Sequence, residues 1–127
     1  GEDDLFPRCG HWERYRIAEW LNYIATELHK GFGPLWNPTS SDELKQVTRN
    51  FVANKLDYVS KRLGDYPYLR YRRFTIADAY LFVILRWTHM HGISLDRWPN
   101  LIAFEERIAA RPAVAEALAA EGFGPAS

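Results

Sequence analysis

The chain has 127 residues, a length that suits one domain with a single core and is short for two. Apolar residues make up 47% of it and charged residues 25%, which excludes the composition of a disordered protein. The 16 basic and 16 acidic residues cancel, so no net field draws in nucleic acid or an anionic membrane, and we expect neither as a partner.

Cysteine content and hydropathy indicate in which cellular compartment the protein works. The single cysteine, Cys9, has no partner within the chain for a disulfide, and we expect it to be a bystander rather than a reactive thiol. The longest apolar run, Ile76 to Leu85, is interrupted by Asp78 and is far shorter than the roughly 20 residues that span a bilayer. No signal peptide pattern is seen at the N-terminus. We therefore expect a cytoplasmic protein.

The first third of the chain predicts a linker and one long helix. Residues 1–11 are acidic, contain Pro7 and Gly10 and lack an apolar period, so they predict an interdomain linker remnant. Gly31, Gly33 and Pro34 predict the end of the following helix and a loop up to Ser40. Within that helix, Trp12 to Lys30, the apolar side chains recur at helical spacing: Ile17, Trp20, Leu21, Ile24 and Leu28.

A second long helix is predicted from Ser40 to Gly64. Ser40 and Glu43 have the spacing of a capping box at its start. The segment Asp65 to Arg73 has no clean period and predicts an irregular loop. The apolar side chains that we expect to be buried along the second helix are Leu44, Val47, Phe51, Leu56, Val59 and Leu63.

Three further helices complete the predicted domain. Thr75 and Asp78 have the spacing of a second capping box, whose helix is apolar nearly all the way round through Trp87 and so belongs in the centre. Pro99 predicts the first turn of a helix to about Ala110, and Pro112 predicts another that ends near Gly122. The fold class is therefore all-α: a five-helix bundle over residues 12–122 with a buried central helix starting at Thr75, followed by a tail at residues 123–127.

Three segments resemble one protein family. Phe74-Thr75-Ile76-Ala77-Asp78-Ala79-Tyr80 matches the signature of the glutathione transferase C-terminal domain, and Arg14 to Phe32 closely resembles the first helix of that domain in the bacterial beta class. Arg111-Pro112 and Ala120-Glu121-Gly122 resemble its final helices.

The resemblance, which covers Trp12 to Gly122, has two departures. It implies that the thioredoxin-like N-terminal domain, which holds glutathione and the catalytic cysteine of the beta class, is absent from this chain. Tyr71 stands where relatives usually have a glycine, and a left-handed turn would strain a tyrosine, so we expect that loop to differ.

A polar face of the first helix carries the candidate glutathione site. Asn22 and His29 are seven residues apart and are expected to point the same way, with Thr26 between them. The resemblance implies that Asn22, His29 and Lys30 bind glutathione, with His29 as a residue that assists catalysis by holding the thiol or thiolate. Without the resemblance, these side chains would be interpreted as a solvated helix face.

The resemblance also implies an apolar pocket for the second substrate, lined by Phe32, Trp36 and Trp87. Periodicity alone would place Trp87 in the core. His89 and His91 lack a third ligand at a recognised spacing, so we expect no metal. The basic cluster Arg70, Arg72 and Arg73 is interleaved with aromatic residues, a pattern that can stack on single-stranded nucleic acid, but zero net charge favours a solvated loop.

The resulting prediction is the C-terminal domain of a glutathione transferase. It contributes the electrophile pocket and part of the glutathione site for conjugation of glutathione, the co-substrate, to hydrophobic electrophiles, with no other cofactor. The chain alone is expected to be inactive, and the intact protein to be a homodimer through the first two helices. The alternative is a stand-alone helical interaction module without catalysis, which predicts no role for His29.

Overall fold

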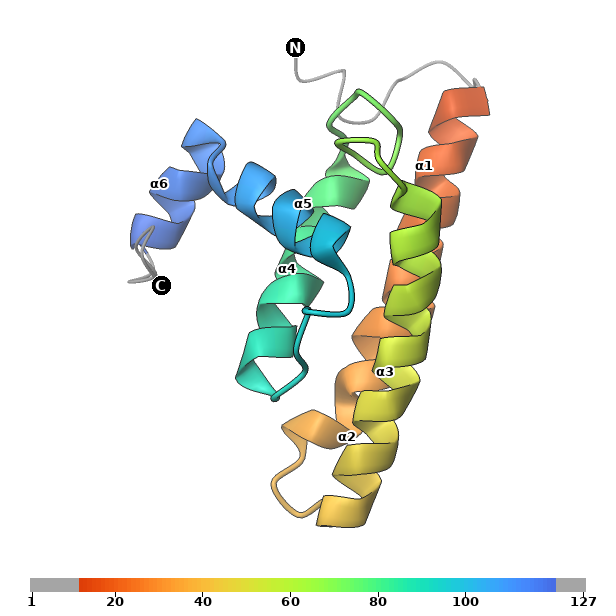
Figure 1. Cartoon of the computed structure of the whole chain (residues 1–127), viewed down its shortest axis with the longest axis vertical. Helices are drawn as coiled ribbons and strands as arrows, with labels where there is room; N and C mark the ends of the chain where they lie inside the picture. Colours follow the sequence, from red (N-terminus) through yellow and green to blue (C-terminus); the bar gives the residue numbers. More distant parts are fainter. Residues whose placement is uncertain (1–11, 121–127) are drawn as a thin grey trace.

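A computed structural model describes residues 12–120, and this part of the chain is helical, with no β-strand. Two long helices, α1 and α3, run antiparallel to each other, α4 packs beside them, α5 crosses α4, and α6 lies at the far edge (Figure 1). The predicted all-α bundle is confirmed, and its five main helices are α1 (Trp12–Tyr23), α3 (Asp42–Leu63), α4 (Ile76–Met90), α5 (Pro99–Ala109) and α6 (Pro112–Ala120).

The first helix does not end at Lys30 as predicted. It continues as the π-helix η2, the 3₁₀-helix η3 and the short helix α2, so most of the predicted loop is helical. Gly33 has φ −42° and ψ −55°, in the right-handed helical region, and Pro34 lies in the first turn of α2, where its missing N–H is not needed. The three segments are Ile24–His29, Lys30–Phe32 and Gly33–Trp36.

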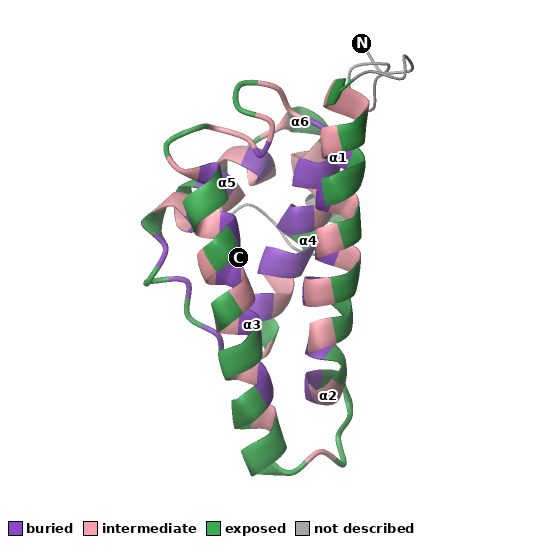
Figure 2. Cartoon of the chain, turned by 90° about the vertical axis from the view of Figure 1, so that its right-hand side faces the viewer, coloured by how far each residue is buried: buried purple, intermediate pink, exposed green. Residues whose placement is uncertain are grey.

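The cap of α3 lies one residue later than predicted. Ser41, not Ser40, is the N-cap, and its Oγ accepts a hydrogen bond from the Leu44 N–H at 3.0 Å. The predicted apolar stripe is correct only in the second half of the helix. The buried residues are Thr48, Val52, Leu56, Val59 and Leu63, whereas Leu44, Val47 and Phe51 are exposed (Figure 2).

The loop between α3 and α4 contains the left-handed turn that we expected it to avoid. Tyr71 has φ 70°, and two isolated bridges pair Tyr68 with Tyr71 and Arg70 with Arg73. Tyr68 and Tyr71 exchange two backbone hydrogen bonds of 3.0 Å. The Tyr71 ring lies 4.6 Å from that of Tyr66. These contacts offset the cost of the left-handed backbone.

The N-terminus of α4 has the predicted capping box. Asp78 Oδ2 accepts the Thr75 N–H at 2.8 Å, and Thr75 Oγ1 accepts the Ala77 N–H at 3.2 Å. Asp78 Oδ1 also accepts the Leu69 N–H at 2.8 Å, which ties the preceding loop to the helix. Both capping side chains are fully buried, so they replace partners that water cannot supply there.

The central position of α4 is confirmed, although one stripe of it faces outward. Ala77, Leu81, Phe82, Ile84 and Leu85 are buried against the surrounding helices. By contrast, α4 exposes three large apolar side chains at seven-residue spacing, Ile76, Val83 and Met90.

The rest of the core comes from α1, η2, η3, α2, α3 and α5, and from loop residues on both sides of α4: Leu69, Ile93, Leu95 and Trp98. No helix in residues 12–120 is long and apolar enough to cross a membrane. The predicted linker with Cys9, and the predicted tail, lie outside the described residues.

Candidate functional site

The π-helix η2 orients His29. A π-helix has wider, i→i+5 turns, so each residue turns the chain through a smaller angle than in an α-helix. Over the six residues Ile24–His29, successive side chains therefore depart from the directions of a regular α-helix. His29 is the last residue of η2, and its Nδ1 lies 2.7 Å from the hydroxyl oxygen of Tyr80 on α4, while the imidazole remains exposed.

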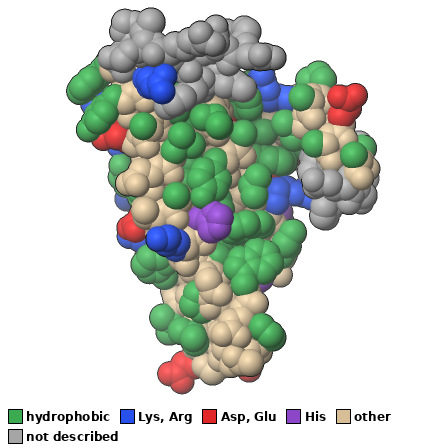
Figure 3. All heavy atoms as spheres, turned by 180° about the vertical axis from the view of Figure 1, so that it is seen from behind, with side chains coloured by type: hydrophobic (Ala, Val, Ile, Leu, Met, Phe, Trp, Pro, Cys, Tyr) green, Lys and Arg blue, Asp and Glu red, His purple; other side chains and the backbone are tan. Residues whose placement is uncertain are grey.

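An aromatic cluster surrounds His29. The His29 ring lies 5.1 Å from that of Trp87 in an edge-to-face arrangement, and Trp36 contacts the same indole at 5.2 Å. Trp87 is half-buried and Trp36 is exposed. Figure 3 shows the face of the molecule on which α4 lies, where apolar side chains gather across the middle and charged ones are few. The sequence predicted Trp36 and Trp87 as pocket residues, and the structure brings both together with His29.

Phe32 and His91 form the inner side of this cluster. Phe32 is fully buried, so its ring belongs to the core and is not at the surface of the cluster, where the prediction placed it. Its ring lies 5.5 Å from that of Trp87 and 5.9 Å from that of His91. His91 also packs against Trp36 at 4.4 Å, and its buried Nε2 has no hydrogen-bonding partner among the described residues. Burial, with Arg49 and Lys45 nearby, lowers the pKa of His91.

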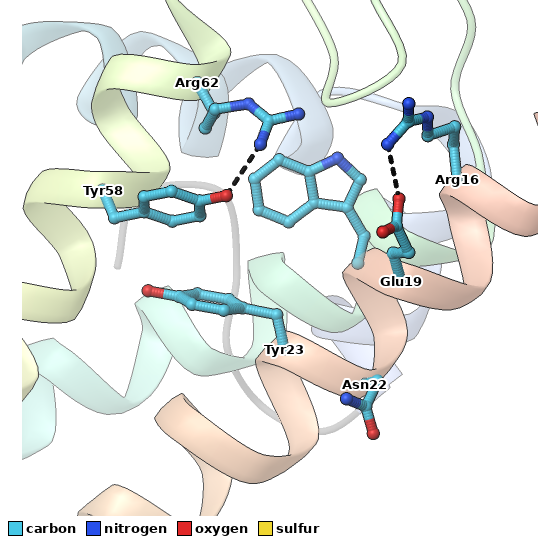
Figure 4. Close-up of a pocket in the computed structure, with 7 residues that line it drawn as sticks. Arg16, Glu19, Asn22, Tyr23, Tyr58 and Arg62 are labelled. Atoms are coloured by element: carbon cyan, nitrogen blue, oxygen red, sulfur yellow. Dashed lines mark hydrogen bonds and ion pairs between the residues drawn. The ribbon is translucent and has the colours of Figure 1, made fainter.

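Asn22 lies elsewhere, so the prediction that it shares a face with His29 is wrong. That prediction assumed a regular α-helix, and η2 breaks the regularity between the two residues. Asn22 is at the rim of a cavity of about 270 Å³ between α1 and α3 (Figure 4). The cavity is lined by Arg16, Glu19, Trp20, Asn22, Tyr23, Tyr58 and Arg62.

The walls of this cavity are aromatic, and their hydroxyl and charged groups are paired. The Arg62 guanidinium donates to the Tyr58 hydroxyl at 2.7 Å and lies 5.5 Å from the Trp20 ring. The Tyr23 hydroxyl donates to the Lys55 carbonyl oxygen at 3.0 Å. Burial raises the pKa of Tyr23 to about 12, with a smaller contribution from Glu27. Arg16 and Glu19, which also line the cavity, form an ion pair of 2.8 Å.

The remaining candidate residues are Lys30, His89 and the basic loop. Lys30 is exposed beside His29. His89 Nε2 pairs with Glu105 Oε1 at 2.8 Å, and no group of three or more His, Cys, Asp or Glu within residues 12–120 is arranged to hold a metal ion. Arg70 makes two hydrogen bonds of 2.8 Å to the Glu13 carboxylate, so this member of the basic loop is neutralised.

Sequence reasoning missed Tyr80, Tyr58 and Arg62. Tyr80 was noted only as the end of the signature segment, because its contact with His29 joins residues 51 positions apart. Tyr58 and Arg62 have the i, i+4 spacing of neighbours on one helix face, a signal that predicts their contact with each other but not with α1.

Comparison with known proteins identifies the fold. The family "Glutathione S-transferase, C-terminal domain" matches residues 23–112. The chain is 50% identical over 110 residues to glutathione S-transferase GstA of Escherichia coli O157:H7, an alignment that covers 87% of this chain and 55% of that protein.

Two solved structures are also similar over nearly the whole chain. A bacterial beta class glutathione S-transferase from Sphingomonas chungbukensis matches with a TM-score of 0.87 and 44% identity, over 94% of this chain and 59% of that one. A sphingomonad glutathione S-transferase complexed with glutathione matches with a TM-score of 0.87 and 39% identity, over 94% and 60%.

The chain thus spans little more than half the length of these relatives. The matched segment includes the capping box of α4, the helix that carries His29 and the tryptophan that packs on it. The chain belongs to the glutathione S-transferase family and corresponds to its all-helical C-terminal domain.

Proposed function

We propose that this domain supplies one side of a site at which glutathione is conjugated to a hydrophobic electrophile. The observation that carries the proposal is the exposed imidazole of His29 set against Trp87 at 5.1 Å, with Trp36 packed against the same indole at 5.2 Å. A polar donor beside an apolar aromatic surface suits a thiol and an apolar co-substrate held next to each other. The structure of a relative complexed with glutathione supports this proposal.

Each residue has a distinct role in this proposal. His29 holds the sulfur of the thiol or thiolate, and the ammonium group of the adjacent Lys30 offsets the negative charge of glutathione. Trp36 and Trp87 supply the wall against which the electrophile packs, and buried Phe32 fixes that wall from behind. Breadth toward electrophiles follows from a wall of large apolar rings that imposes few hydrogen bonds.

The exposed stripe of α4 supports a further domain as partner. Ile76 is 43%, Val83 45% and Met90 55% exposed, on a helix whose other large apolar side chains lie in the core or in the aromatic cluster. Exposed apolar side chains aligned along one helix mark an interaction surface. We assign this surface to a thioredoxin-like domain that binds and activates glutathione. Catalysis in the whole protein then rests mainly on that domain. We place the whole protein in the cytoplasm.

The α1–α3 face supports a homodimer of the whole protein. Leu44, Val47 and Phe51 are exposed along the first half of α3, and the cavity that includes Asn22 lies on the same pair of helices. In this arrangement Asn22 contacts a glutathione molecule from across the dimer, which fits its place at the cavity between α1 and α3. A helical interaction module without catalysis is not favoured, because the similar proteins are glutathione transferases over this segment.

A chimera tests the proposed function. The part of the Escherichia coli relative that precedes the matched segment is fused to this chain at Trp12, and conjugation of glutathione to a chlorinated dinitrobenzene is followed by absorbance. We expect activity in the chimera, at least a tenfold lower kcat/KM in its His29→Ala variant, and none in the 127-residue chain alone.

The matched control is His89→Ala, because His89 is an exposed histidine paired with Glu105 outside the aromatic cluster. It should retain the activity of the chimera. A folded, glutathione-binding chimera that has no activity, or one that is indifferent to His29→Ala and Trp87→Ala, would contradict the proposal.

A further inference from the structure

The side chain of Tyr80 packs against the core, and its hydroxyl oxygen lies close to a residue 51 positions away in the sequence. Tyr80 lies in the second turn of α4, and its hydroxyl oxygen is 2.7 Å from His29 Nδ1. This distance is short for a hydrogen bond between an oxygen and a nitrogen. We propose that Tyr80 is a positioning residue: its hydroxyl donates to His29 Nδ1 and so fixes the neutral imidazole with its proton on Nε2.

The direction of this hydrogen bond follows from the chemistry of the two groups. A neutral imidazole has one nitrogen that donates and one that accepts, while a phenol has a single O–H donor. The pyridine-type nitrogen of imidazole is a stronger acceptor than a phenol oxygen, so the favoured arrangement is O–H···Nδ1. The imidazole proton must then be on Nε2, because the other nitrogen already accepts.

Two ring contacts restrict the imidazole together. The Trp87 ring meets the imidazole at 5.1 Å with an interplanar angle of 84°. The Tyr80 ring lies 6.0 Å away at 76°. These two ring contacts alone would still allow the imidazole to rotate by half a turn about its bond to Cβ, because this rotation alters the shape of the ring little. The hydrogen bond to Tyr80 distinguishes the two orientations.

No other group within residues 12–120 makes a hydrogen bond with the imidazole. The hydroxyl of Thr26, on the same helix, donates instead to the Asn22 carbonyl oxygen at 2.8 Å. The Nε2–H of His29 therefore remains available on the exposed side. This inference rests on the proposed function, in which that N–H donates to the sulfur of the bound thiolate; a fixed donor favours the anion over the neutral thiol.

Nitrogen NMR of the 127-residue chain tests the assignment directly. Two-bond ¹H–¹⁵N correlations of the histidine rings, recorded at a pH where His29 is neutral, distinguish Nδ1–H from Nε2–H. We expect Nε2–H in the wild type and an Nδ1 resonance characteristic of an acceptor. In Tyr80→Phe the ratio of the Nε2–H to the Nδ1–H form should fall about two- to tenfold, the change in an equilibrium constant that an ordinary hydrogen bond produces.

The control is Tyr58→Phe, which removes a hydroxyl that accepts from Arg62 on α3 and should leave His29 unchanged. Backbone amide shifts of Thr75 and Asp78 report whether Tyr80→Phe preserves the start of α4, which a purely structural role for Tyr80 would disturb. An Nδ1–H form in the wild type, or the same tautomer ratio in Tyr80→Phe and wild type, would overturn the inference. If Tyr80→Phe does not fold, the tautomer of His29 in the wild-type spectrum is by itself the test of the inference.

A second experiment, in which glutathione is added to the chimera, separates this inference from the proposed function. In the chimera, addition of glutathione should shift the His29 Nε2 resonance, and the shift should be smaller in Tyr80→Phe. A chimera whose His29 is unaffected by bound glutathione defeats the proposed function while leaving the tautomer result standing. A normal glutathione response with an unaltered tautomer in Tyr80→Phe defeats only the role of Tyr80.

Discussion

The N-termini of α3 and α4 use the same capping device in opposite environments. Ser41 accepts one backbone N–H at an exposed helix start, and water is available to the others. Thr75 and Asp78 are both fully buried, and Asp78 alone accepts from Thr75 and Leu69. The comparison shows that the local sequence signal sets where a helix begins, whereas burial sets how much the cap contributes to stability.

Removal of the Asp78 carboxylate should have the largest effect. Asp78→Ala leaves the N–H groups of Thr75 and Leu69 buried without an acceptor, which costs about 2–5 kcal/mol for the two groups together. Urea unfolding followed by circular dichroism measures this loss. Asp42→Ala, in the exposed first turn of α3, is the control and should cost less than about 1 kcal/mol. Equal losses at the two sites would show that burial does not govern the caps.

The pH dependence of stability follows from the same carboxyl group. Burial raises the pKa of Asp78 from 3.8 to about 6, against backbone hydrogen bonds from Leu69 and Thr75 that lower it. The folded state then binds more protons than the unfolded state between these values, so the free energy of unfolding should fall as pH rises from about 4 to 6 and level off above. The shift corresponds to about 3 kcal/mol.

Urea unfolding at a series of pH values measures this dependence, with Asp78→Asn as the comparison. The amide does not titrate, so the variant should lose the fall between about pH 4 and 6. Parallel curves for wild type and variant would assign the pH dependence to other groups.

Removal of the capping hydroxyl should also cost more stability at the buried start of α4 than at the exposed start of α3, but the difference should be smaller than for the carboxylates. Thr75→Ala should cost about 2 kcal/mol, because the buried Ala77 N–H loses its acceptor, and Ser41→Ala about 0.5–1 kcal/mol. Paired thermal and urea unfolding of the two variants gives the difference. A Ser41→Ala loss as large as that of Thr75→Ala would remove the distinction between the two helix starts.

The C-terminal ends of α3 and α4 should also differ, because of the backbone conformation of Gly64. Gly64 has φ 55° and Gly92 has φ 72°, and an added Cβ at either meets nothing nearer than 3.9 Å. Gly64→Ala should cost about 1–3 kcal/mol, because ψ −130° places Gly64 outside the left-handed helical region that other residues can visit. Gly92→Ala should cost about 1 kcal/mol for its positive φ. Gly33→Ala, at right-handed φ with open space around it, is the control and should be neutral or slightly stabilising. Equal losses at Gly64 and Gly92 would show that the ψ angle of Gly64 adds no cost.

Local signals predicted much of the fold. The start of α4 at Thr75 depends on two side chains three residues apart, and Pro99 and Pro112 begin α5 and α6 as expected. The first half of α3 was predicted wrongly, because apolar spacing cannot show whether a helix face meets the core or another surface. Leu44, Val47 and Phe51 keep helical spacing and are nevertheless exposed.

The candidate site was predictable as a set of residues but not as an arrangement. Trp36 and Trp87 were grouped by resemblance, and the structure places them against His29. Tyr80 was missed because its partner is distant in sequence, and Asn22 was misplaced because a six-residue π-helix has no recognised sequence signal. Phe32 was assigned to the pocket surface, although its ring is in the core.

The π-helix η2 also affects how this sequence should be aligned with others. A π turn contains one more residue than an α turn, so Ile24–His29 holds an extra residue relative to a regular helix. A relative whose first helix is regular would need a one-residue gap inside this segment, and a gap placed in the following turn would pair His29 with the wrong position. Loss of one residue from the segment would restore a regular helix and leave His29 in the same place against α4, because the chain on either side of a π turn keeps its register.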